Sequence, residues 1–299
     1  MPMRMITLVL ILALAAPSSL LARGSAPEHL VSVVRSAETG AFGLLGGVFY
    51  DEGRKRLYVA DTTGGRILSY DESFAYVSQF DGGGRLSAPS ALVRDVQGRF
   101  YVIQAGESVV LAVDMQGKTM IPLDMGSVRG INPVHPVNLA LDEDDNLYVA
   151  DGANQRVLVF GADRLYRRAI PVPDGEGLRD VKVTGGRVFT VNALKGGVCV
   201  YDLSGRLVAR FGERGRGTGE LAFPVSIAVA SGGQIHVLDR HRCKVLVFSA
   251  QGTFLHEFSR EGWREGRLHF PSYLFRNRAG QLFVVDRQNE RVSVFEQER

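Results

Sequence analysis

The chain has 299 residues, of which 45% are hydrophobic and 35 are glycines, and this is enough to bury a substantial core in one domain. Its formal net charge of +3 is too small to argue by itself for a nucleic-acid or membrane-surface partner. The presence of only two cysteines excludes a disulfide framework.

The first 22 residues have the pattern of an export signal. Arg4 supplies a positive charge, the mostly apolar run Ile6–Ala16 follows, and Pro17 ends it. This run is short for a membrane span. We therefore expect a signal peptide over residues 1–22, cleaved after Ala22 or alternatively at Ala15, and a single domain over residues 23–299. The expected location is periplasmic or secreted, and an uncleaved N-terminal anchor is the alternative.

Six copies of one pattern occupy most of the remaining chain. Each copy has a short run rich in β-formers, a polar turn and a second such run, which predicts two antiparallel strands. The clearest copy is Asn146–Phe160, NLYVADGANQRVLVF. The residues that end the first run of each copy are Asp61, Gln104, Asp151, Asn192, Asp239 and Asp286. Their spacing of 41 to 47 residues is typical of a β-propeller with one four-stranded sheet per repeat.

The residues of this pattern resemble a known family. LYVAD at Leu147–Asp151, a loop containing Asn and Gly, and RVLVF at Arg156–Phe160 are similar to the NHL repeat, and the glycine-rich link Phe211–Pro224 is similar to the loop between NHL repeats. The resemblance covers nearly all of the chain after the first thirty or so residues, and it implies a six-bladed β-propeller. NHL propellers include scaffolds, RNA binders and enzymes, so the resemblance leaves the function open.

The two ends of the repeat array complement each other. Leu30–Val34 (LVSVV) predicts a strand with no repeat of its own, and the sixth repeat reaches only its third strand, at Val292–Phe295. Earlier repeats continue into a fourth strand, such as Leu207–Phe211. We predict that Leu30–Val34 pairs with Val292–Phe295. The fold would then be an all-β ring of six four-stranded antiparallel blades without an open edge.

An aspartate followed five residues later by a cation recurs in four repeats. These pairs are Asp61/Arg66, Asp151/Arg156, Asp239/Lys244 and Asp286/Arg291. In the other two repeats both partners are replaced together, as Gln104/Val109 and Asn192/Gly197. The joint replacement favours ion pairs between the second and third strands, each worth about 0.2–1 kcal/mol if exposed. A ring of acidic ligands is the functional alternative.

Related propellers that bind metals offer a residue-by-residue comparison. In the lyase of the amidating enzyme, zinc histidines directly follow the proline of the first strand, where this chain has Ser90, Val137, Val225 and Ser272. Calcium lactonases use Glu, Asn and Asp around the channel, where the inner strands of this chain start with Gly47, Ala91, Asn138, Asp180, Ser226 and Tyr273. Only Asn138 and Asp180 offer suitable oxygens, whereas calcium takes six or more. We expect no cofactor, with a calcium ion as the alternative.

Several other polar residues have no pattern typical of a site. Two loops one repeat apart carry Arg210, Arg214, Arg216, Arg260, Arg264 and Arg267. We interpret them as solvated loops and expect no nucleic-acid partner. None of the six histidines has a spacing typical of a metal site. A disulfide between Cys199 and Cys243 remains open.

We therefore expect an exported, monomeric, non-enzymatic propeller that binds a protein or another envelope or extracellular partner. If a ligand binds at the mouth of the channel, the side chains expected to contact it are Asn138, Arg179, Asp180 and Tyr273. The alternative for Arg179 and Asp180 is that they neutralise each other or face solvent. The alternative function is a metal-dependent lyase or lactonase that acts at the channel mouth.

Overall fold

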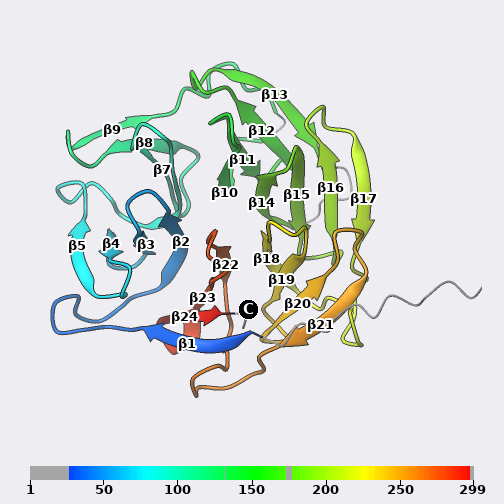
Figure 1. Ribbon diagram of the computed structural model, residues 1–299. Coiled ribbons are helices and arrows are strands. Elements are labelled where there is room, and N and C mark those ends of the chain that lie inside the picture. Colours follow the sequence, from blue (N-terminus) through cyan, green and yellow to red (C-terminus); the bar gives the residue numbers. More distant parts are fainter. Residues whose placement is uncertain (1–26, 131, 173–176, 297–299) are drawn as a thin grey trace, which may run out of the picture.

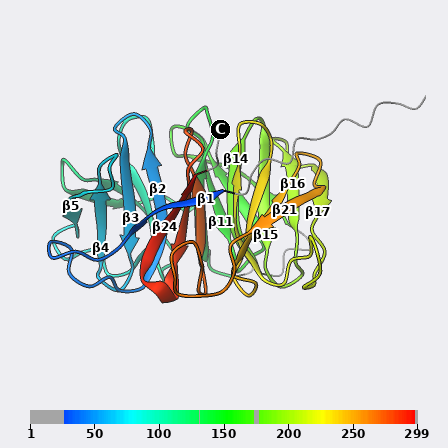
Figure 2. The ribbon, with the colours of Figure 1, turned by 60° about the horizontal axis from the view of Figure 1, so that its bottom comes forward.

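The protein is a ring of six four-stranded antiparallel sheets around a central axis, as seen in a computed structural model that describes residues 27–130, 132–172 and 177–296 (Figure 1). Viewed more from the side, the ring shows loops on two opposite faces (Figure 2). The six-bladed propeller predicted from the repeats is confirmed. The predicted signal segment, residues 1–22, lies outside the described residues. Within the described ranges, no helix is both long and apolar enough to span a membrane.

Each blade begins with an inner strand at the axis and ends with an outer strand at the rim. Blades 1 to 5 follow the chain order and contain β2 (Leu45–Asp51), β3 (Arg56–Asp61), β4 (Arg66–Tyr70) and β5 (Tyr76–Phe80); β6 (Pro89–Arg94), β7 (Phe100–Gln104), β8 (Val110–Asp114) and β9 (Thr119–Pro122); β10 (Pro136–Leu141), β11 (Leu147–Asp151), β12 (Arg156–Phe160) and β13 (Tyr166–Pro171); β14 (Leu178–Thr184), β15 (Arg187–Asn192), β16 (Val198–Asp202) and β17 (Leu207–Phe211); β18 (Pro224–Val229), β19 (Ile235–Asp239), β20 (Lys244–Phe248) and β21 (Phe254–Phe258). Blade 6 contains β22 (Tyr273–Arg276), β23 (Leu282–Asp286), the short 3-10 helix η1 (Arg287–Asn289), β24 (Arg291–Glu296) and, as its outer strand, β1 (Glu28–Val33).

The second strand of a blade is buried on both faces. All residues of β7, β11, β19 and β23 are buried, because neighbouring blades cover both sides of each sheet. Their runs of Val, Leu, Ile and aromatic residues suit this environment. The outer strand β17, in contrast, is exposed or half-buried along its length. The continuous apolar runs in the sequence therefore reflect the packing of sheet against sheet.

The ring closes through β1, as predicted. This strand pairs antiparallel with β24, with Glu28 opposite Glu296 and Val33 opposite Val292. In Figures 1 and 2, β1 (blue) lies beside β24 (red), so the two ends of the described chain meet in one blade. The observed strand starts two residues earlier and ends one residue earlier than the predicted Leu30–Val34. Blade 6 thus gains the fourth strand that its own repeat lacks.

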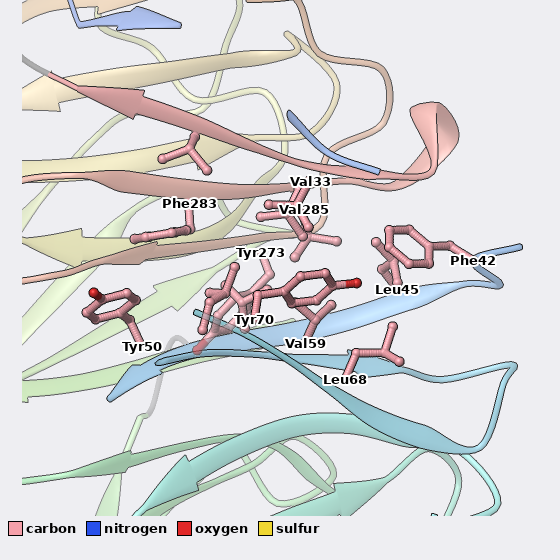
Figure 3. Packing of buried hydrophobic residues seen from close by; sticks show 14 residues of the cluster. Val33, Phe42, Leu45, Tyr50, Val59, Leu68, Tyr70, Tyr273, Phe283 and Val285 are labelled. Atoms are coloured by element: carbon pink, nitrogen blue, oxygen red, sulfur yellow. The ribbon is translucent and has the colours of Figure 1, made fainter. Parts of the chain in front are cut away.

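The seam between blades 6 and 1 has a hydrophobic core of its own (Figure 3). Val33 of β1, Tyr50 and Val59 of blade 1, and Phe283 and Val285 of blade 6 are buried in this cluster. The rings of Tyr50 and Phe283 stack with their centroids 5.7 Å apart. Closure therefore joins side chains as well as backbone hydrogen bonds.

Three of the four predicted ion pairs form, each with a distance of 2.9 Å between the Arg Nε and an Asp Oδ2. They are Asp61–Arg66, Asp151–Arg156 and Asp286–Arg291. The three aspartate side chains are fully buried, so the energy range for exposed pairs does not apply to them. Their Oδ1 atoms accept hydrogen bonds from backbone N–H groups that precede the inner strand: Gly43, His135 and His269. Each aspartate therefore ties two strands to the loop that leads into its blade.

The predicted pair of Asp239 and Lys244 is wrong. The Asp239 carboxylate accepts hydrogen bonds from four backbone N–H groups, those of Ala222, Phe223, His241 and Arg242. Lys244 instead contacts Glu257 of β21. Asp239 and Lys244 are opposite each other in the sheet. They do not pair, because backbone donors satisfy the Asp239 carboxylate and Glu257 is available to Lys244.

We expect measurable coupling between Asp151 and Arg156. Asp151→Ala should cost about 3 kcal/mol or more in unfolding free energy, because it removes the counterion of Arg156 and leaves Arg156 Nε and the His135 N–H without an acceptor. The double alanine variant should cost less than the sum of the single variants, by about 0.5–3 kcal/mol. Urea denaturation of the four proteins measures this coupling. The exposed pair Asp163/Arg167 is a matched control, for which we expect no more than about 1 kcal/mol, and additivity at both pairs would contradict the prediction.

Candidate functional site

One face of the ring gathers the starts of the inner strands and the ends of the second strands. In blade 3, for example, Pro136 at the start of β10 lies opposite Asp151 at the end of β11. The same antiparallel pairing brings the loops that follow the second strands to this face. We call the opening of the central channel on this face the axial mouth.

The axial mouth contains a cavity of about 300 Å³ that is lined from all six blades. Its lining residues are Leu44, Leu45, Gly46, Thr62, Ser90, Ala91, Ala105, Gly106, His135, Pro136, Val137, Asn138, Arg179, Val225, Arg240, Ser272, Tyr273 and Arg287. Asp and Glu are absent from this set of described residues. The charged side chains at the mouth are therefore the three arginines.

Six of the lining residues occupy equivalent positions, one in each blade: Gly46, Ser90, Val137, Arg179, Val225 and Ser272. In blades 1 to 5 the register between the inner and second strands shifts at this position. A bulge re-aims a side chain out of the regular ladder, and here the residue faces the mouth. Arg179 of blade 4 is the charged member of this ring, and it is exposed.

The structure separates the four side chains that the sequence proposed for ligand contact. Asn138, Arg179 and Tyr273 line the cavity, whereas Asp180 does not and is fully buried. Asp180 does not pair with Arg179. Its ionic partner is Lys182, with 2.8 Å between Nζ and Oδ1.

Four donors converge on the Asp180 carboxylate. Oδ1 accepts hydrogen bonds from Asn138 Nδ2 at 2.5 Å and from Lys182 Nζ. Oδ2 accepts from Ser226 Oγ at 2.6 Å and from the backbone N–H of Ile227 at 2.9 Å. These residues, which we call the Asp180 cluster, connect the inner strands of blades 3, 4 and 5 beneath the mouth.

Lys182 extends the cluster to blade 6. Its Nζ donates to Tyr273 Oη at 3.1 Å and lies 4.7 Å from the centroid of the tyrosine ring. Burial lowers the pKa of Lys182, but the Asp180 carboxylate and the Tyr273 oxygen outweigh burial and raise this pKa overall. Burial raises the pKa of the Tyr273 phenol. At neutral pH the lysine is therefore charged and the tyrosine is protonated.

The oxygens of this cluster do not fit a calcium ion. Asn138 Oδ1 accepts the N–H of Leu139 at 2.7 Å, and both Asp180 oxygens already have two donors. Lys182 places a positive charge where a cation would have to bind. Among the residues that the structure describes, no group of three or more His, Cys, Asp or Glu side chains is arranged to hold a metal ion.

The sequence analysis missed two residues of the site, Arg240 and Arg287. Each follows the aspartate that ends a second strand, Asp239 or Asp286, and each lines the cavity beside Arg179. The equivalent positions of the other blades hold the small residues Thr62, Ala105, Gly152 and Ala193. An alignment of the six repeats at this position would have revealed both arginines.

None of the three arginines forms an ion pair within the described part of the chain. Arg240 Nε donates to Pro271 O at 3.3 Å, and its guanidinium lies 5.8 Å from the centroid of the Phe223 ring. Arg287 Nε is buried and has no hydrogen-bond partner there. Burial first, and then the charges of Arg287 and Arg179, lower the pKa of Arg240. The three cations are therefore close enough to repel one another.

The remaining histidines and cysteines lie in different surroundings. His135 lines the mouth and is exposed. His236 is buried in β19, and burial, with Arg276 and His256 nearby, lowers its pKa to about 4. Cys199 and Cys243 are buried and do not form a disulfide.

Comparison with known proteins establishes the fold and leaves the activity open. The family model DUF5128, described as a 6-bladed beta-propeller, matches residues 175–261. Among curated proteins, none is significantly similar to this chain in sequence.

Three solved structures illustrate the range of similar propellers. A virginiamycin B lyase from Staphylococcus aureus has 9% identity and a TM-score of 0.64, and the similarity covers 85% of this chain and 80% of that one. A gluconolactonase from Xanthomonas campestris has 15% identity and a TM-score of 0.69, with 94% and 93% covered. An auxiliary nutrient binding protein from Bacteroides thetaiotaomicron has 15% identity and a TM-score of 0.65, with 87% and 71% covered. At such low identity these likenesses show the shared fold alone.

Proposed function

We propose that this protein is an exported, non-enzymatic binding propeller of the NHL type, and that its ligand binds at the axial mouth. The observation that carries this proposal is a cavity of about 300 Å³, open at one face, above a channel whose acidic group already has four donors. Concave sites of roughly 300 Å³ and above are typical of small-molecule binding. The partner is then a compact envelope or extracellular ligand.

The chemistry of the Asp180 cluster supports binding over catalysis. A general base must reach the proton that it removes, but Asp180 is fully buried and does not line the cavity. Lys182 and Tyr273 hold their protons at neutral pH, because the pKa of each is raised. These three groups stabilise the inner strands and leave little capacity for proton transfer to a ligand.

The alternative is a metal-dependent lyase or lactonase. It is favoured by the fold likeness to a virginiamycin B lyase and a gluconolactonase, since propeller enzymes can share a frame and differ in their sites. Against it, Asn138 and Asp180 contact each other and do not leave oxygens for a shared cation. The positions of the zinc histidines hold Ser90, Val137, Val225 and Ser272, and His135 is the single histidine among the described lining residues.

A thermal-shift screen with a small-molecule library tests the proposal. We expect compounds that raise the melting temperature of the wild-type protein to have no effect on Ala105→Trp, in which an indole fills the mouth from an exposed position. Val96→Trp is the matched control, because Val96 is 80% exposed and is not part of the cavity. Mass spectrometry should recover every bound compound unchanged, including lactones incubated with added Ca²⁺ or Zn²⁺. Metal-dependent conversion of any compound, or equal binding to Ala105→Trp, would overturn the proposal.

A further inference from the structure

We propose that the ligand of the axial mouth is a small organic anion with at least two carboxylate or phosphate groups, held by Arg179, Arg240 and Arg287. This inference rests on the proposed function and specifies the chemistry of the ligand. The three arginines come from blades 4, 5 and 6, so they cover one side of the mouth. An anion with two separated acidic groups can contact more than one of them at once.

The arginines are mounted on fixed parts of the ring. Arg179 occupies the bulge of β14, and Arg240 and Arg287 directly follow the buried strands β19 and β23. Phe223 lies against the guanidinium of Arg240, and Pro271 O accepts from it. The strands fix the backbone at these positions, and the contacts of Arg240 also hold its guanidinium, so binding to Arg240 needs little reorganisation.

The positive charge at the mouth has no internal counterion among the described residues. Asp239 and Asp286 precede two of the arginines, but both are fully buried, and their oxygens accept from backbone N–H groups and, for Asp286, from Asn289 and Arg291. Three neighbouring cations without an acid among the cavity residues repel one another. A bound polyanion would remove this repulsion, and a neutral ligand would not.

Two buried donors at the mouth are unused within the protein. Arg287 Nε and Ser272 Oγ have no hydrogen-bond partner in the described structure, and both residues line the cavity from blade 6. Buried polar groups are nearly always hydrogen-bonded in folded proteins. Both atoms are closed off from solvent in the unliganded protein, so the oxygens of a carboxylate or phosphate would satisfy them once the two side chains turn toward the cavity.

The opposite side of the mouth favours an organic ligand over an inorganic ion. Among the described lining residues, blades 1 to 3 contribute no charged acid or arginine there, and Leu44, Ala105 and Val137 form an apolar part of their lining beside the polar His135 and Asn138. This surface can cover the carbon skeleton of a ligand while the arginines hold its acidic groups. The cavity of about 300 Å³ also suits a compact molecule better than an extended nucleic acid.

Calorimetric titration at low ionic strength tests the inference with defined probes: citrate, succinate, inorganic phosphate, and succinamide as the neutral counterpart of succinate. We expect citrate or succinate to bind with 1:1 stoichiometry and succinamide not to bind. Arg240→Gln and Arg287→Gln should each weaken binding about tenfold or more. Added NaCl should weaken it further. Arg278→Gln is the matched control, because Arg278 is an exposed arginine in the turn after β22, at the opposite end of blade 6.

The inference would be overturned by no binding of citrate or succinate, by equal binding to the Arg240→Gln/Arg287→Gln protein, or by tighter binding of an oligonucleotide than of citrate. Phosphate binding alone, without the organic acids, would also contradict it. These failures are distinguishable from failure of the proposed function. Neutral compounds that bind the wild-type and Arg240→Gln/Arg287→Gln proteins equally, but not Ala105→Trp, would retain the binding function and refute the anionic ligand.

Discussion

Deletion of β1, Glu28–Val33, is expected to give an aggregating protein or one that is much less stable than the full chain. The deletion exposes the backbone N–H and C=O groups of β24 that β1 pairs in the intact ring, and an exposed edge is a template for pairing with other chains. It also removes Val33 from the seam core, and Val31 from its partly buried margin. The loss should exceed about 4 kcal/mol, which few single substitutions reach. Thermal melting and size-exclusion chromatography measure the effect.

The matched control is deletion of residues 1–22, the predicted signal peptide, which should leave the melting temperature unchanged. Val33→Asp tests the same seam without shortening the chain, because it places a carboxylate in a position that is 4% exposed. A β1-deleted protein that stays monomeric and melts like the full chain would show that the seam does not depend on this strand.

Asp180→Ala is expected to destabilise the fold by about 3–5 kcal/mol, the usual cost of removing one partner of a buried ion pair. The substitution removes the counterion of Lys182 and one hydrogen-bond acceptor each from Lys182, Asn138 and Ser226, and the side chain of Lys182 is only 17% exposed. Guanidinium denaturation should show a lower midpoint with an unchanged slope.

The double variant Asp180→Leu/Lys182→Met provides the control for this interpretation. Replacing both charges by apolar groups of similar size should recover much of the loss, because no uncompensated charge remains. The raised pKa of Lys182 also sets the upper limit of the pH range in which the lysine contributes. The stabilisation is fully present below the ordinary lysine pKa of about 10.4 and is lost only as the pH rises through the raised value. An Asp180→Ala protein within about 0.5 kcal/mol of wild type would refute the role of the cluster.

The fold could be predicted from the sequence because its signals are local and repeated. The recurring Asp and Arg positions define the second and third strands, and three of the four pairs form as expected. The orphan strand near the start and the incomplete sixth repeat identify each other, and the observed pairing of Val33 with Val292 confirms the closure. The strand pattern occurs in six repeats, so it can still be recognised where one repeat departs from it, as at Gln104. Gln104 Oε1 accepts from Ser87 and Ala88, much as the aspartates accept from their own loops.

The site was harder to predict because its contacts cross between blades. Asp180 and Ser226 are 46 residues apart, and no short-range pattern indicates that they meet. Asn138 and Asp180 were correctly placed near the axis, but their hydrogen bond to each other removes them as free ligands. Arg240 and Arg287 had a signal in the aligned repeats, because they replace small residues. The position of Arg240 and Arg287 within a blade is enough to place them at the mouth, whereas the contacts of Asp180 depend on residues of other blades.

The closure by β1 also has a consequence for the folding pathway. Blades 1 to 5 consist of strands adjacent in sequence, so their hairpins can form over short chain distances, whereas Glu28 meets Glu296 only after almost the whole described chain is available. The entropy cost of closing a loop grows with its length, and such non-local pairings form slowly. We expect the seam to assemble late and to open early during unfolding. The kinetic lifetime of the folded ring would then depend on a single strand of six residues.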